Sequence, residues 1–109
     1  LRGIAFGSIA YLDDGGEVIG QGEIIYIKPS WLPDAPKSVL AYAAGNPAFP
    51  HEGTEDQWFS ESQFESYRAL GEYQMSWLLD RIRFVNAEQP TPGELFARTR
   101  AILAPLQRA

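Results

Sequence analysis

A helical repeat of apolar residues in the second half of the chain constrains the fold most strongly. Between residues 61 and 85, apolar or small side chains recur at steps of three and four: Phe64, Tyr67, Gly71, Met75, Leu78, Ile82 and Val85. This spacing is typical of a helix with one buried face. Ser60 and Gln63 form a capping-box pattern at its start. We therefore predict one long amphipathic helix over residues 61–85. Because glycine weakens a helix by about 1 kcal/mol, we expect another element, with the hairpin as the candidate, to approach closely at Gly71.

Residues 1–28 show the pattern of a β-hairpin. Residues 4–11 read as a strand that is apolar on both faces, and residues 22–28 are rich in β-branched and aromatic side chains. Between them lies the run Asp13-Asp14-Gly15-Gly16, whose residue types tolerate the positive φ of a tight turn. The sequence therefore predicts two strands joined at this run.

Residues 29–60 are predicted to hold irregular Pro-rich loops and one short helix. Asp34 is a good N-cap for a helix over about residues 36–44, and Gly45 is expected to end that helix in the left-handed conformation. A second capping-box pattern is expected to open a single turn; it is formed by Thr54 and Gln57, and the turn would carry Trp58 and Phe59.

The C-terminal segment predicts a final helix over about residues 92–104. Thr91, Pro92 and Glu94 supply its N-cap, its first-turn proline and its capping-box acid. Its inner side is expected to carry Leu95, Phe96, Thr99, Ile102 and Leu103, with Pro105 near its end. The 109 residues therefore predict one small α+β domain: a hairpin (1–28), loops with a short helix (29–60) and a helical part (61–109).

Charge and composition exclude several classes of function. Nine Lys and Arg against 14 Asp and Glu leave a net charge of −5, which disfavours a nucleic-acid interface because phosphate contacts need clustered cations. The absence of Cys excludes disulfides, a thiol nucleophile and a Cys-ligated zinc site. No apolar run in the sequence approaches the roughly 18 residues of a membrane span. The chain opens at Leu1 without Met, so we expect a soluble piece of a longer protein.

The sequence contains no set of residues typical of catalysis. His51 is the only histidine and stands beside Glu52; a catalytic zinc site normally takes three protein ligands, so we expect a loop residue instead. Asp13 and Asp14 do not follow the spacing of a calcium loop and are expected to lie in a solvated turn. None of the serines stands in Gly-x-Ser-x-Gly. We therefore predict no catalytic residue, no metal site and no cofactor.

The stretch over residues 22–72 resembles a known family. Its most specific runs are Phe49-Pro50-His51, Thr54-Glu55-Asp56-Gln57-Trp58-Phe59 and Gln63-Phe64-Glu65-Ser66-Tyr67-Arg68-Ala69-Leu70-Gly71. This order is similar to the C-terminal part of a group of bacterial patatin-like phospholipases, where such a stretch follows the catalytic core.

The resemblance implies a parent protein that is a serine lipid acyl hydrolase, located in the cytoplasm or on a membrane. Such enzymes use a Ser–Asp dyad and a Gly-rich oxyanion loop. This chain has neither the serine motif nor that loop, and only Asp14-Gly15-Gly16 echoes the aspartate motif. No catalytic residue is therefore carried over. We expect a non-catalytic segment that supports the catalytic domain of its own parent chain and its acyl-binding face, and that meets lipid acyl chains through the parent.

Within that hypothesis, the loop over residues 46–58 has a structural role. We expect five polar side chains to form a hydrogen-bonding hub that fixes the loop: His51, Glu52, Thr54, Asp56 and Gln57. Arg68 is expected to pair with one of the acids among them. The alternative hypothesis is a free-standing protein-interaction module without enzymatic activity. In that case the hairpin edge would offer its backbone groups to a partner strand, or the aromatic residues would mediate dimerisation.

Overall fold

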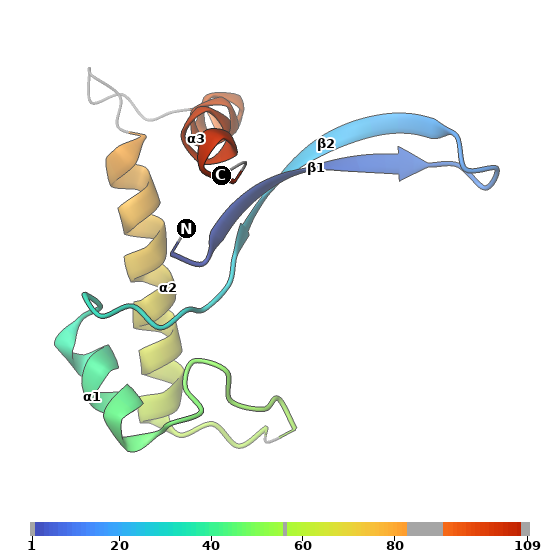
Figure 1. Ribbon diagram of the computed structural model, residues 1–109. Coiled ribbons are helices and arrows are strands. Elements are labelled where there is room, and N and C mark those ends of the chain that lie inside the picture. Colours follow the sequence, from blue (N-terminus) through green and yellow to red (C-terminus); the bar gives the residue numbers. More distant parts are fainter. Residues whose placement is uncertain (1, 56, 83–90, 108–109) are drawn as a thin grey trace.

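The computed structural model has an α+β architecture of one hairpin and three helices. It describes residues 2–55, 57–82 and 91–107. The hairpin of β1 (Ile4–Leu12) and β2 (Val18–Ile27) precedes three helices, α1 (Lys37–Gly45), α2 (Glu61–Arg81) and α3 (Pro92–Gln107). The hairpin extends away from the helices, α1 lies beside one half of α2, and α3 lies near the other end of α2 (Figure 1). The predicted fold class is confirmed.

The hairpin closes at the predicted turn. The strands are antiparallel, with Ile4 opposite Ile27 and Leu12 opposite Val18. One carboxylate oxygen of Asp13 accepts hydrogen bonds from the backbone N–H groups of Gly15 and Glu17, both at 2.9 Å. Gly16 has a φ of +85°, a value that glycine adopts without a steric penalty. Local turn chemistry therefore holds this end of the hairpin together.

The short helix differs from its prediction at both ends. Its N-cap position is Pro36 rather than Asp34, and no side chain caps it. Asp34 instead accepts hydrogen bonds from Arg2, at 2.7 Å to each carboxylate oxygen. Gly45 is the last helical residue and its φ is not positive, because Asn46 takes the C-cap position. The distant arginine, which local sequence does not reveal, engages the expected cap residue.

The second capping-box pattern does not open a helical turn. A turn is present at residues 54–55, but residues 57–60 follow as irregular backbone. Trp58 and Phe59 both lie in this irregular segment, with exposed fractions of 91% and 56%. The pattern at Ser60 and Gln63 is confirmed, since the Ser60 side chain caps α2 by accepting a hydrogen bond from the backbone N–H of Gln63 at 3.1 Å.

The buried face of α2 is rotated from the predicted one. Residues at steps of four are buried: Ser66, Leu70, Gln74 and Leu78. Phe64, expected inside, is 65% exposed, and α2 ends at Arg81. The rest of the predicted helix, residues 83–85, lies outside the described part of the chain. The prediction followed apolar spacing alone and missed two polar residues that hydrogen bonds keep inside.

The close approach expected at Gly71 occurs at another glycine. A methyl group placed on Gly71 meets no atom within 4 Å. At Gly3, with a φ of +74°, the same methyl group would lie 2.3 Å from the carbonyl oxygen of Lys28. Gly3 is therefore the position where the hairpin base passes too near its neighbours for any side chain.

Two apolar clusters form the core. The first joins α1, α2 and the loops through Leu32, Ala35, Val39, Phe49 and Leu70. The second joins the hairpin base to α2 and α3 through Ile4, Leu78, Ile82 and Leu103. Gln74, only 1% exposed, connects the hairpin to α2: its side-chain nitrogen donates to the carbonyl oxygens of Arg2 at 2.7 Å and Lys28 at 2.9 Å.

The last helix is longer than predicted. Thr91 caps it by accepting a hydrogen bond from the N–H of Glu94 at 3.2 Å, and Thr99 and Leu103 are fully buried, as expected. The helix continues through Pro105 to Gln107. Gln107 forms two hydrogen bonds with the backbone of Phe6, and these contacts stabilise the final turn. Among the described helices, none is both long and apolar enough to cross a bilayer.

Candidate functional site

Glu52 is the polar centre of the loop that precedes α2. Its two carboxylate oxygens accept hydrogen bonds from the hydroxyl of Tyr42, at 3.0 and 3.2 Å, and one also accepts from the side-chain nitrogen of Gln63 at 3.3 Å. The backbone N–H of Glu52 donates to the Tyr67 hydroxyl at 3.2 Å. One residue therefore ties the loop to α1 and α2 at once.

Aromatic side chains pack together beside the polar contacts of Glu52. The Phe49 ring is buried and lies edge-on between two tyrosines, with centroids 5.2 Å from Tyr42 and 4.8 Å from Tyr67. Such edge-to-face pairs contribute about 0.5–1.5 kcal/mol beyond area burial. Burial, together with the Glu52 carboxylate, raises the pKa of the Tyr42 hydroxyl, and burial raises that of Tyr67. Both hydroxyls therefore keep their protons at neutral pH.

A pocket of about 360 Å³ opens beside Glu52. Apolar surface dominates its lining, which is formed by Pro29, Pro50, Glu52, Gly53, Thr54, Phe59, Gln63, Phe64 and Tyr67. Its volume falls in the range of small-molecule sites, roughly 300–1,000 Å³, and such sites combine apolar walls with a few polar groups. Phe59 and Phe64, both exposed, line this pocket.

The predicted hub residues separate into two groups. Glu52 and Thr54 line the pocket, and Glu52 makes the contacts above. The His51 side chain is exposed, and its backbone N–H donates to the carbonyl oxygen of Ala48 at 2.7 Å. Gln57 is exposed as well, and Asp56 lies outside the described residues. Within the described part of the chain, the hub is centred on Glu52.

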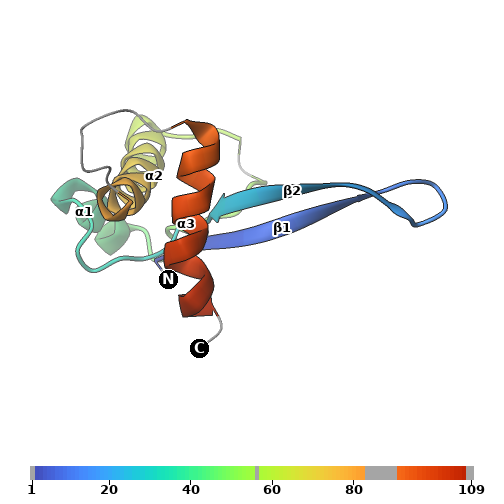
Figure 2. The ribbon, with the colours of Figure 1, turned by 90° about the horizontal axis from the view of Figure 1, so that it is seen from above.

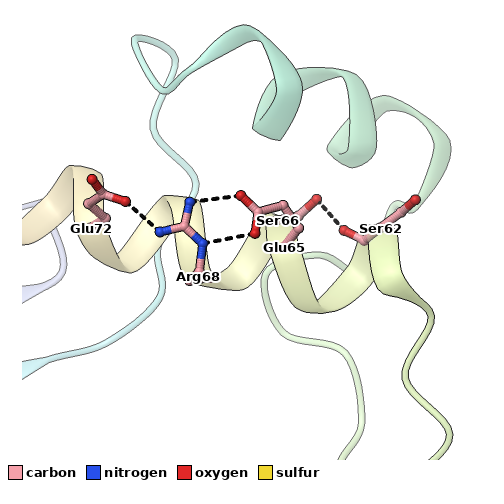
Figure 3. Close-up of polar contacts among 5 residues, drawn as sticks. All are labelled: Ser62, Glu65, Ser66, Arg68 and Glu72. Carbon is pink, nitrogen blue, oxygen red and sulfur yellow. Dashed lines mark hydrogen bonds and ion pairs between the residues drawn. The ribbon is translucent and has the colours of Figure 1, made fainter.

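Arg68 lies on α2 and pairs within that helix. It forms ion pairs with Glu65 at 2.7 Å and Glu72 at 2.5 Å (Figure 3). The sequence predicted that Arg68 would pair with an acid in the loop over residues 46–58. In the structure its partners lie on α2 instead. Helical neighbours at steps of three and four lie close to each other, so Glu65 and Glu72 are both within reach of the guanidinium. Exposed pairs of this kind contribute little to stability.

The other candidate residues are not assembled into a centre. Asp14 lies in the exposed hairpin turn and does not line the pocket. In the described part of the chain, no group of three or more His, Cys, Asp or Glu side chains is placed to hold a metal ion.

Three residues of the site were missed by reasoning from sequence. Tyr42, Gln63 and Tyr67 supply the side-chain partners of Glu52. Gln63 and Tyr67 are one helical turn apart on α2, a spacing that places two polar groups on the same face. Tyr42 comes from α1, and only the packing of α1 against α2 brings it there.

Comparisons with known proteins return no relative. No family model, no curated protein and no solved structure matches this chain.

Proposed function

We propose that this chain is a non-catalytic segment of a patatin-like serine lipid acyl hydrolase, and that its pocket contributes to the acyl-binding face of the parent enzyme. The observation that carries the proposal is the apolar, aromatic-lined pocket of about 360 Å³ beside Glu52. It lies within residues 22–72, the stretch on which the resemblance rests. Apolar walls favour an acyl chain, and the Glu52 carboxylate favours a neutral or cationic head group over an anionic one.

The coding region upstream of Leu1 tests the assignment to this enzyme class. The proposal expects a Gly-rich loop, a Gly-x-Ser-x-Gly motif and a separate Asp-Gly-Gly or Asp-Gly-Ala motif there. An upstream Met with none of these motifs between it and Leu1 would contradict the assignment.

Lipid binding tests the pocket itself. Dihexanoylphosphatidylcholine, kept below its micelle concentration, is titrated into the purified chain while tryptophan fluorescence is followed, since Trp58 adjoins the pocket residue Phe59. Wild type is expected to give a saturable change, and Phe64→Ser to bind about tenfold more weakly, because an apolar contact of roughly 1.5 kcal/mol is lost.

Leu79→Ser is the matched control for this titration. Leu79 is an exposed apolar residue on the same helix, and it does not line the pocket. The control should bind lipid as wild type does, and circular dichroism should show that both variants keep their helices. Equal binding by wild type and Phe64→Ser would remove the pocket from the proposal.

A free-standing interaction module is the second candidate function, and the surface of the chain favours it. The accessible surface is 7,935 Å², against about 6,000 Å² for a compact monomer of this mass. The radius of gyration is 17.2 Å, against about 13 Å for a compact chain of this length. Hydrophobic-dye binding discriminates the two candidates: an autonomous module is expected to bind none, whereas a segment separated from its parent domain is expected to bind dye.

A further inference from the structure

We propose that the free edge of β1 pairs with the same edge of a second copy of this chain, so that two hairpins form a four-stranded antiparallel sheet around a two-fold axis. The inference rests on the second candidate function and names its partner. It does not depend on the lipid hydrolase assignment.

The first argument is the direction of the β1 backbone groups. In an antiparallel pair, residues alternate between those that bond the partner strand and those whose N–H and C=O point away from it. Lys28 donates its N–H to the carbonyl oxygen of Gly3, so odd-numbered residues of β1 face β2. Phe6 bonds to Gln107 instead, which shows that even-numbered residues face the open edge.

Gln107 protects only part of this edge. Its side-chain amide accepts from the Phe6 N–H at 2.7 Å and donates to the Phe6 carbonyl oxygen at 2.9 Å, which is the bonding that a neighbouring strand would supply. Ser8 and Ala10 follow on the same edge, before the bulge between Tyr11 and Leu12, and both are exposed. Their outward N–H and C=O groups therefore form a short template for strand addition.

The second argument is that this edge is complementary to itself. Antiparallel pairing centred on Ile9 sets Ser8 of each copy opposite Ala10 of the other. The outward N–H and C=O groups of Ser8 and Ala10 in one copy then all bond to those of the other. The same register continues to Leu12, 56% exposed, opposite Phe6 of the second copy, where the Gln107 amide must first release the Phe6 backbone groups. Phe6 packs its ring near Phe96 of α3, so an apolar side chain that is uncovered in one copy gains an apolar neighbour in the other.

The third argument is charge. The turn end of the hairpin carries Asp13, Asp14 and Glu17, whereas the opposite end carries the exposed Lys28, directly after β2, and the Arg2–Asp34 ion pair, which leaves one net positive charge. Antiparallel pairing places the acidic end of each hairpin beside the basic end of the other. A parallel arrangement would bring the two acidic turns together, so the charges favour the antiparallel one.

The available surface is large enough for this interface. The chain exposes about 1,900 Å² more than a compact monomer of its mass, and a standard interface buries about 800 Å² on each partner. The outer half of the hairpin is not covered by any described helix (Figure 2), so its surface is open to such an interface.

Proline substitution tests the edge. Light scattering coupled to size exclusion is recorded for the purified chain from about 1 μM to about 1 mM, a range that covers weak and moderate affinities. Wild type is expected to shift toward twice the monomer mass of 12.1 kDa. Ala10→Pro removes an outward N–H without breaking a β1–β2 bond, and it should weaken dimerisation at least tenfold.

Gln21→Pro is the matched control, because Gln21 lies directly opposite Ala10 and its N–H faces the other edge of the hairpin. It should dimerise as wild type does. A wild-type chain that stays monomeric at every concentration overturns the inference, and so does a dimer that Ala10→Pro leaves unchanged. In the second case an interaction module remains supported; a monomer that also binds dye instead favours a segment separated from its parent domain.

Charge exchange tests the orientation. The Asp14→Lys/Glu17→Lys double variant and the Lys28→Glu variant should each dimerise more weakly than wild type, because like charges then meet at both ends of the interface. When the two variants are mixed, both contacts become attractive and mixed dimers should exceed either homodimer. A mixture without this preference overturns the antiparallel arrangement.

Discussion

The two ends of the hairpin are built from similar strand sequence yet have opposite surroundings. At the base, Ile4 is 1% exposed and packs with residues of α2 and α3. At the turn end, the apolar residues are open to solvent: Tyr11 at 53%, Leu12 at 56%, Val18 at 54% and Ile19 at 70%. The strands pair along their length, with one bulge between Tyr11 and Leu12. Backbone pairing and apolar composition therefore do not decide burial; it depends on how far α2 and α3 reach along the ladder (Figure 2).

The largest contrast is expected between two glycines that both have positive φ. Gly3→Ala at the base places a methyl group 2.3 Å from a backbone oxygen, so we expect a loss of about 3 kcal/mol or more in the free energy of unfolding. Gly16→Ala at the turn end meets no atom within 4 Å and should cost only about 1 kcal/mol of backbone strain. Urea denaturation measures both, and equal losses would contradict the tight contact at the base.

A smaller contrast is expected from side-chain truncation. Ile4→Ala removes a buried side chain from the second apolar cluster and should cost about 2–4 kcal/mol through lost burial and the cavity left behind. Ile19→Ala removes an exposed side chain and should stay within about 0.5 kcal/mol for the monomer. Thermal or urea unfolding of dilute protein checks the pair. A large effect at Ile19 in dilute protein would mean that the turn end is covered even in the monomer.

The smallest contrast is expected in how the free energy of unfolding depends on pH at the two ends of the hairpin. The Arg2 guanidinium lowers the pKa of Asp34 at the base, so the native pKa lies below the unfolded value, near 3.8. The contribution of this pair is therefore fully present above the unfolded pKa and is lost as pH falls through the native pKa. Asp34→Asn should be less stable than wild type at neutral pH, and the difference should shrink toward about pH 2.

Asp14→Asn, in the exposed turn, is the control for this pH series. Urea midpoints at neutral and acidic pH provide the measurement, and the control should follow wild type at both. A gap between wild type and Asp34→Asn that stays constant with pH would show that the carboxylate charge is not what Arg2 binds.

The candidate site was partly predictable from sequence. Glu52 was expected to help fix its loop, and its backbone N–H donates a hydrogen bond to the Tyr67 hydroxyl. Its partners were not identified, since Tyr42 and Tyr67 come from two helices that meet only in the folded chain. Arg68 was expected to bind a loop acid, but it pairs with Glu65 and Glu72, which the helix itself brings within reach. Contacts within one helix follow from spacing, whereas contacts between elements depend on how the elements pack.

Local chemistry in the sequence by itself determined where the hairpin turns and where α2 and α3 begin. The Asp-Gly turn closes the hairpin, Ser60 starts α2 and Thr91 starts α3, because each of these signals acts through backbone groups a few residues away. The tertiary structure alone decided which face of α2 is buried and how much of the hairpin is covered. Polar Gln74 is buried because two carbonyl oxygens of the hairpin base bind it, whereas apolar Phe64 and Ile19 stay exposed because no described element covers them. Whether a residue is buried depends on which segment, distant in sequence, covers it. A local sequence pattern does not specify that segment.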